Sequence, residues 1–125
     1  MMKTLILPAA AALVLTGATT AHAAGDPGKG KASFVQCAAC HKADASGANT
    51  IGPNLWKVAG RKAGTQPGYA YSAAMKASAR PWTDAALDAY LAAPAKAVPG
   101  NKMPFAGLKN PADRANVIAY LRTLK

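Results

Sequence analysis

The sequence places two cysteines and a histidine in one five-residue stretch, Cys37-Ala-Ala-Cys40-His41, and the chain has no other cysteine. Two thiols three residues apart can form a local disulfide, contribute to a zinc site, exchange electrons as a dithiol pair, or anchor a c-type haem. A cysteine nucleophile with His41 as its base is a further possibility. These chemistries need different surroundings, so the rest of the chain decides between them.

Four of these possibilities find little support. Structural zinc sites take about four protein ligands, and too few candidates accompany this motif. Thiol oxidoreductases normally carry CxxC near a βαβ pattern, and no segment here alternates like a strand. Neighbouring helical residues point in different directions, which disfavours a Cys40–His41 catalytic pair. One local CxxC bridge also cannot join distant segments, as a disulfide-stabilised scaffold requires.

The remaining possibility is covalent attachment of a single haem c. In a helical turn Cys37 and Cys40 lie on one side, so both sulfurs can reach the two vinyl groups of one haem edge. His41 is then placed to ligate the iron from below. We therefore predict one haem c, attached through Cys37 and Cys40, with His41 as the proximal iron ligand.

The N-terminal 23 residues read as a secretory signal. Lys3 precedes an apolar run, and the small-residue pattern Ala21-His22-Ala23 predicts cleavage after Ala23. The apolar run from Leu5 to Leu15 is shorter than the ~20 residues of a membrane-spanning helix. Residues 24–125 are then expected to form a single exported domain without stable membrane insertion, located in the periplasm.

The second axial ligand of the predicted haem depends on this cleavage. Residues 24–125 keep one histidine, His41, and two methionines, Met75 and Met103. We favour Met103, because its stretch PGNKMPFAG is rich in proline and glycine and can carry a thioether across the haem face. Met75 lies in a helical-looking stretch, where a methionine usually fills the core. Ligation by Met75 and an open iron position remain as alternatives.

The elements that position these residues are helices and long loops. We expect a short helix from Pro27 through KASFVQ into the cysteines, and a proline- and glycine-rich loop over residues 49–70. A helix capped by Thr83 should end at Pro94. Another, capped by Asn110, should run to the C-terminus. The expected fold is a small all-α domain in which a haem completes a modest core.

Several motifs now make the sequence recognisable. It resembles the small class I cytochromes c, mitochondrial type and bacterial periplasmic relatives, in CAACH, GPNLW, GRKAG, PGYAYS, Trp82, LDAYL, PGNKMPFAG and VIAYL. The resemblance covers nearly all of residues 24–125. It implies the cytochrome c fold, with the N- and C-terminal helices packed together and short helices and long loops around one covalent haem. It also implies axial ligation by His41 and Met103.

The resemblance further implies roles for residues around the haem. The carbonyl of Pro53 would accept a hydrogen bond from the His41 ring. Asn101 stands where relatives have threonine, two residues before the methionine, and is expected to donate a hydrogen bond. The remaining matches are three residues that contact the haem propionates in relatives and a buried tyrosine near the methionine: Arg61, Tyr71, Trp82 and Tyr90.

The expected function is one-electron transfer. A closed His/Met site has no vacant position for a substrate, which predicts an electron carrier and no enzyme. A peroxidase-like or gas-binding protein with a labile methionine is the alternative. Fourteen Lys and Arg against five Asp give residues 24–125 a charge of +9. Export argues against nucleic acid as the partner.

The basic charge instead predicts transient, salt-dependent docking of a monomer onto acidic faces of membrane-bound redox complexes. The expected donor is a quinol–cytochrome c oxidoreductase, and the expected acceptor is a terminal oxidase or another protein. Five lysines near the haem-attachment and methionine segments are candidates for the docking surface: Lys31, Lys42, Lys96, Lys102 and Lys109.

Overall fold

The computed structural model describes residues 12–14, 17 and 24–125. The predicted cleavage site after Ala23 lies outside the described residues. Within the described part of the chain, no helix is long and apolar enough to cross a membrane. That part contains no strand, and its one isolated β-bridge pairs Lys62 with Pro81. The all-α class is therefore confirmed. The six helices are α1 (Pro27–Ser33), α2 (Val35–Ala38), α3 (Ala73–Ser78), α4 (Asp84–Ala92), α5 (Pro94–Ala97) and α6 (Pro111–Leu121).

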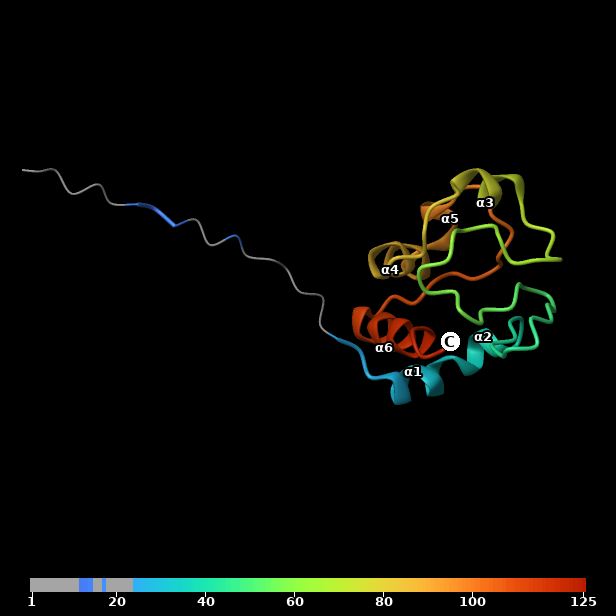
Figure 1. The fold of residues 1–125 in the computed structure, drawn as a ribbon, viewed down its shortest axis with the longest axis horizontal. Coiled ribbons are helices and arrows are strands. Elements are labelled where there is room, and N and C mark those ends of the chain that lie inside the picture. The colour runs from blue at the N-terminus through green and yellow to red at the C-terminus, as the bar shows by residue number, and fades with distance from the viewer. Residues whose placement is uncertain (1–11, 15–16, 18–23) are drawn as a thin grey trace, which may run out of the picture.

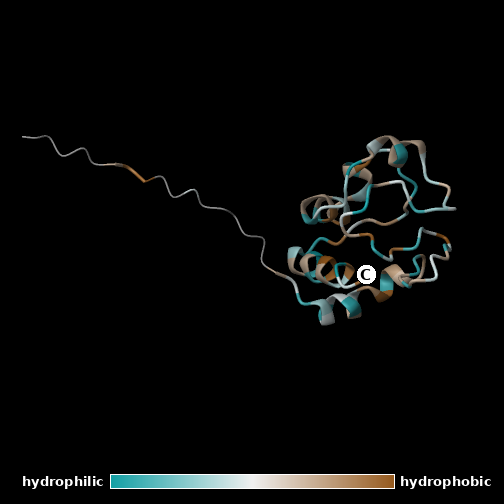
Figure 2. Ribbon diagram, viewed as in Figure 1, coloured by the Kyte–Doolittle hydropathy of each residue, from teal (hydrophilic) through white to brown (hydrophobic). Residues whose placement is uncertain are grey.

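The first and last helices form the most extensive helix–helix contact, as expected. A side chain at Gly30 would place its Cβ only 1.9 Å from the carbonyl oxygen of Asn116, so the two backbones approach directly. Beside this contact the rings of Phe34 and Tyr120 lie 5.1 Å apart. Val117, in the same helix pair, is almost completely buried. Figure 1 shows α1 and α6 side by side, and Figure 2 shows apolar and hydrophilic residues alternating along α6.

The helix ends follow local sequence signals. Asp26 caps α1 by accepting hydrogen bonds from the N–H groups of Gly28 and Lys29. The side-chain oxygens of Thr83 and Asn110 cap α4 and α6 in the same way. Each oxygen satisfies backbone donors that have no partner inside the helix. The predicted starts of α4 and α6 are confirmed.

Three helix boundaries differ from the expectation. The N-terminal helix is interrupted at Phe34, which ends α1 and precedes α2 while its backbone stays in the right-handed helical region. Pro94 ends α4 but also begins α5, because its fixed φ suits a first helical position. The C-terminal helix stops at Leu121, where the chain turns so that the Leu124 carbonyl accepts a hydrogen bond from Lys57 at 2.8 Å.

The helices fall into two groups separated by loops. In Figure 1, α1, α2 and α6 lie on one side, and α3, α4 and α5 lie on the other. Residues 39–72 and 98–110 connect and flank these groups without forming helices. At Gly107 the second loop passes α4 closely, with a φ of +113° and a Cβ position 2.1 Å from the Ala92 oxygen. A residue with a side chain would not fit there.

Candidate functional site

A cavity of about 550 Å³ lies between the two helical groups. It is lined by apolar residues from both groups, including Phe34, Leu87 and Val117. All ten residues that the sequence singled out as site residues also line it: Cys37, Cys40, His41, Pro53, Arg61, Tyr71, Trp82, Tyr90, Asn101 and Met103. The alternative methionine, Met75, lines it as well.

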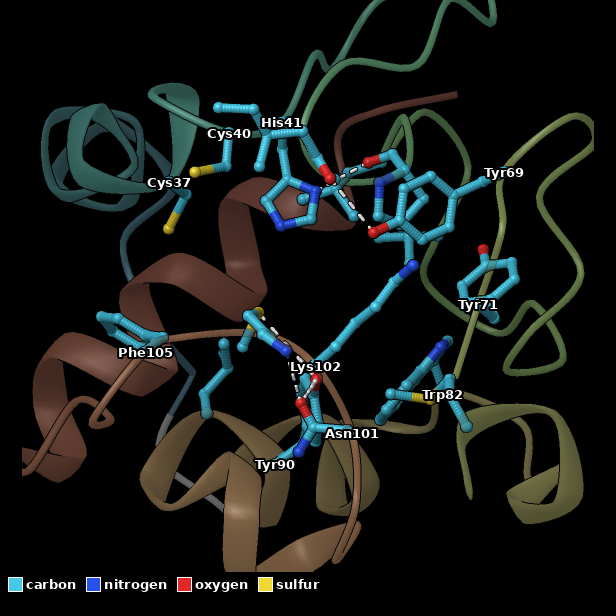
Figure 3. Close-up of a pocket in the computed structure, with 18 of the residues that line it drawn as sticks. Cys37, Cys40, His41, Tyr69, Tyr71, Trp82, Tyr90, Asn101, Lys102 and Phe105 are labelled. Atoms are coloured by element: carbon cyan, nitrogen blue, oxygen red, sulfur yellow. Dashed lines mark hydrogen bonds between the residues drawn. The ribbon is translucent and has the colours of Figure 1, made fainter. Parts of the chain in front are cut away.

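The cysteine pair lies on one wall of the cavity. Cys37 belongs to α2, and Cys40 follows one turn later, with both thiols free and half-buried. Figure 3 shows the two sulfurs close together beside the His41 ring. Burial raises the pKa of the Cys37 thiol, and the nearby Cys40 adds to that effect. The His41 N–H bonds the Cys37 carbonyl at 2.9 Å, so the helical turn continues through the motif.

The His41 ring is held by one hydrogen bond. Its Nδ1 lies 2.7 Å from the carbonyl oxygen of Pro53, and a carbonyl only accepts, so Nδ1 carries the proton and donates it. The lone pair is then on Nε2. Burial lowers the pKa of His41, while the Pro53 carbonyl acts in the opposite direction. A neutral imidazole with its other nitrogen fixed in this way is the form that binds metals.

Gly52 gives the His41 ring its space. A Cβ at Gly52 would lie 2.5 Å from the ring's Cε1, closer than real contacts allow. The residue follows exposed Ile51 and precedes Pro53, so a short segment both accommodates and orients the imidazole. Gly52 is not among the predicted site residues, although its place in GPNLW next to Pro53 is the signal that indicates a role.

The opposite wall carries Met103 in a loop shaped by Asn101. The Asn101 amide donates to the carbonyls of Pro94 and Val98, both at 2.9 Å, and its oxygen accepts from the Met103 N–H at 2.9 Å. One half-buried side chain therefore supplies the partner of the Met103 N–H and adds a second hydrogen bond to two carbonyls that backbone N–H groups already bond. Asn101 thus donates hydrogen bonds to two backbone carbonyls, and its role toward the haem stays a prediction.

Tyr90 contacts the same loop from α4. Its hydroxyl donates toward the Asn101 oxygen at 3.3 Å and lies 3.9 Å from the Met103 sulfur. Burial raises the pKa of Tyr90 to about 12, so the hydroxyl stays protonated at any ordinary pH. Figure 3 shows Tyr90 and Asn101 together on the side of the cavity opposite His41. The buried Trp82 packs on Tyr90, with ring centroids 5.0 Å apart.

Arg61 and Tyr71 form the polar end of the cavity. Arg61 donates to the carbonyls of Trp56 and Asn54 and, at 2.8 Å, to the side-chain oxygen of Gln66. Burial lowers the pKa of this guanidinium, which nevertheless keeps its charge because arginine ionises far above neutral pH. The Tyr71 hydroxyl accepts a hydrogen bond from the Gln66 N–H at 3.0 Å. This end therefore presents a fixed positive charge and a phenol.

Two polar residues outside the predicted set also shape the site. Asn54 is completely buried and ties three loop positions, donating to the carbonyls of Asp44 and Ala48 and accepting from the Trp56 N–H. Tyr69 stands at the edge of the cavity. Both lie inside motifs quoted above, GPNLW and PGYAYS, but neither has a residue type that by itself indicates a haem contact.

The cavity fits a covalently attached haem. It offers two free thiols at helical spacing, a neutral imidazole with one nitrogen uncommitted, a thioether, apolar walls, and a cationic end suited to carboxylates. Among the described residues no group of three or more His, Cys, Asp or Glu is arranged to bind a metal ion directly. The fold and site define a small all-α protein that binds one haem c through Cys37 and Cys40.

Comparisons with known proteins agree with this class. The sequence profile of the Cytochrome c family matches residues 28–125, and the chain belongs to that family. It is 50% identical to cytochrome c2 of Rhodomicrobium vannielii over 87% of both chains. It is 51% identical to cytochrome c2 of Rhodoblastus acidophilus, over 82% of this chain and 95% of that one.

A solved structure is similar over most of the domain. Cytochrome cH from Methylobacterium extorquens matches with a TM-score of 0.75 and 44% identity, over 79% of this chain and 99% of that one. The recognition as a class I cytochrome c, the fold, and the assignment as an electron carrier rather than an enzyme are thereby confirmed. The iron ligands and the individual roles around the haem stay predictions.

Proposed function

We propose that this protein is a periplasmic one-electron shuttle with His41 and Met103 as axial iron ligands. Residues 24–125 form the mature, monomeric domain after cleavage of the leader. It carries electrons from a quinol–cytochrome c oxidoreductase to a terminal oxidase or another acceptor.

The proposal is supported chiefly by two ligand residues on opposite walls of one cavity, each already positioned by a hydrogen bond. His41 has its Nδ1 committed to Pro53 at 2.7 Å, and Met103 has its backbone committed to Asn101 at 2.9 Å. Each side chain is thus positioned by its own wall. Haem c supplies the one-electron iron couple, and a neutral thioether ligand raises its reduction potential. Rigid walls on both sides keep the change in geometry on electron transfer small.

The surface charge supports acidic partners. The five candidate docking lysines are all exposed. On the acidic side, Asp88 pairs with Arg114 at 2.7 Å and Asp84 pairs with Arg122. Two of the five aspartates are therefore already neutralised by Arg114 of α6 and by Arg122, the residue that follows α6. The remaining positive charge favours fast association with a negatively charged protein face and weak binding at high salt.

Ligand replacement tests the proposal. Ferric haem with a thioether ligand has a weak red charge-transfer absorption, here called the thioether band. Met103→Ala should abolish this band, whereas Met75→Ala, the matched control, should keep it. Loss of the band only in Met75→Ala would contradict the assignment. A wild-type protein without the band and with a high-spin spectrum would favour the peroxidase-like alternative.

Partner choice is tested separately by kinetics. Electron transfer to an acidic terminal oxidase should slow steeply as ionic strength rises, because screening removes the attraction. Replacing Lys42 by Gln should reduce both the low-salt rate and its salt dependence, while Lys57→Gln, outside the five candidate lysines, should change them less. A rate that does not depend on salt would contradict docking on acidic faces.

A further inference from the structure

Tyr69 joins both walls of the cavity at its mouth. Its hydroxyl donates to the carbonyl oxygen of Ile51 at 3.1 Å, on the His41 side. Its ring faces the ammonium of Lys102, whose Nζ lies 5.1 Å from the ring centroid, on the Met103 side. Figure 3 shows the Lys102 side chain extending from beside Asn101 across the cavity toward Tyr69. Tyr69 and Ile51 belong to the loop over residues 39–72, and Lys102 belongs to the loop over residues 98–110.

We propose that Tyr69 is a positioning residue that holds the methionine loop closed over the haem. The contacts of Tyr69 with Lys102 and with the Ile51 carbonyl are called the Tyr69 clasp below. The inference rests on the proposed function, since it takes Met103 to be the ligand that the closed loop holds in place.

The Tyr69 ring is itself held in place by neighbouring residues. The Tyr69 ring meets the Tyr71 ring edge to face, with centroids 4.8 Å apart and planes at 78°. Tyr71 is itself fixed by the hydrogen bond from the Gln66 N–H, and Gln66 is bonded to Arg61 at 2.8 Å. The aromatic ring that Lys102 faces is therefore oriented before the lysine reaches it, which lowers the entropic cost of the contact.

Lys102 has no competing ionic partner among residues 24–125. The two ion pairs found there join α4 with Arg114 of α6 and with Arg122, the residue that follows it. The exposed ammonium therefore has the half-buried ring of Tyr69 as its oriented partner. A cation over an aromatic face is attracted by the ring quadrupole, and the attraction grows as water is excluded.

The position of Lys102 in the chain links this contact to ligation. Lys102 directly precedes Met103, so a movement that withdraws the thioether from the cavity also displaces the lysine backbone. Asn101 holds the loop on its α4 side through Pro94 and Val98. The Tyr69 clasp holds it on the far side, against the segment that carries His41. Opening of the loop must break the Tyr69 clasp, whereas motion of the helices can leave the clasp intact.

Imidazole binding to the ferric holoprotein measures this opening. Imidazole replaces a thioether ligand only after the methionine loop has moved away, so its affinity reports the open population. Lys102→Gln keeps the chain length but removes the charge, and should raise the apparent affinity about threefold. Tyr69→Phe keeps the ring but loses the hydroxyl bond, with an increase of about fivefold. Tyr69→Leu loses both contacts and should raise the affinity about tenfold or more.

Two controls separate the clasp from general destabilisation. Lys57→Gln makes the same charge change at an exposed lysine outside the candidate docking surface and should leave imidazole affinity unchanged. Lys102→Gln should have no further effect in a Tyr69→Leu background, because its partner is already gone. Equal effects of Lys102→Gln in both backgrounds would overturn the clasp, whatever the thermal stability of the variants. A wild-type protein without the thioether band would instead overturn the proposed function and the clasp with it.

Discussion

The α1–α6 pair and the loops around the cavity are stabilised in different ways. In the helix pair, backbone meets backbone: Gly30 lies directly against Asn116, and neighbouring apolar side chains such as Val117 are buried. In the loops, single polar side chains replace the missing secondary structure. Asn54 and Asn101 each bond three backbone groups or more, and Arg61 bonds two carbonyls and a side chain.

Because of this difference, we expect the helix contacts mainly to determine stability and the loop contacts mainly to determine the geometry of the haem site. The close approach of Gly30 to Asn116 depends on shape, and neither residue lines the cavity. Loop geometry depends on a few hydrogen bonds that also position Met103 and the segment before it. Loss of a loop contact should therefore change the haem spectrum at modest cost in stability. Loss of a helix contact should reduce stability without first changing the spectrum. Three substitutions test this separation.

The largest effect is expected for Gly30→Ala. The added Cβ would lie 1.9 Å from the Asn116 oxygen and 2.9 Å from the Tyr120 Cβ, so the two helices must move apart. We expect a loss of about 3 kcal/mol in the free energy of unfolding of the holoprotein, measured with guanidinium chloride. The thioether band should persist until the protein unfolds.

Gly28→Ala is the matched control in the same helix. A Cβ there would meet only the flexible Asp26 carboxylate, at 3.2 Å, so stability should change by at most about 0.5 kcal/mol. Equal stabilities of the Gly30→Ala and Gly28→Ala variants would mean that the helices do not need this close approach.

Asn101→Ala should have an intermediate effect on stability and a larger one on the haem spectrum. The substitution leaves the N–H of Met103 without its partner and removes one of the two hydrogen bonds that each of the Pro94 and Val98 carbonyls accepts. The loss of these three bonds should cost about 2 kcal/mol in all. The thioether band should disappear on heating well before the helices melt, as followed by circular dichroism.

Asn110→Ala provides the comparison for an asparagine that only caps a helix. Asn110 accepts one hydrogen bond, from Ala112 at the start of α6, and its loss should cost about 1 kcal/mol. In this variant the thioether band and the helices should be lost together. If the Asn101→Ala variant also lost both at one temperature, the two regions would unfold as one unit.

The same separation explains how much was predictable from the sequence. Capping residues act on their own backbone neighbours, so Thr83 and Asn110 marked the starts of α4 and α6 correctly. The CAACH spacing placed both thiols and His41 on one wall for the same local reason. Chain reversals that depend on distant partners were not predictable: α6 stops early because Leu124 bonds Lys57, on a loop more than sixty residues away.

The loop contacts of the site show a similar limit. Asn54 and Tyr69 act through partners 10 and 18 residues away, Asp44 and Ile51, and no periodic pattern links such positions. Six of the ten predicted site residues come from a resemblance that preserves their order. All ten line one cavity, and their roles toward the haem stay predictions. Physical reasoning from motif spacing and composition reached the haem and its two candidate methionines, but not the contacts that hold the loops.

The smallest effect is expected at the exposed tip of the loop that follows His41, from Asp44→Ala. The Asp44 carboxylate accepts hydrogen bonds from the Ser46 hydroxyl and from the Ser46 N–H at 3.0 Å. These bonds favour the charged form, so they hold the pKa of Asp44 below its ordinary value of 3.8. A lowered folded-state pKa stabilises the fold above the unfolded value, and this contribution is lost as the pH falls through the folded value.

Thermal midpoints of the wild-type holoprotein and the Asp44→Ala variant should therefore differ slightly at neutral pH and converge well below pH 3.8. Ser46→Ala keeps the carboxylate but removes one donor, so its midpoint should lie between the two and converge with them. A difference that stays constant down to the acid limit would show that Asp44 acts through shape rather than charge. Because Asp44 also offers its backbone carbonyl to buried Asn54 at 3.1 Å, a bond that alanine retains, the thioether band should not change in either variant.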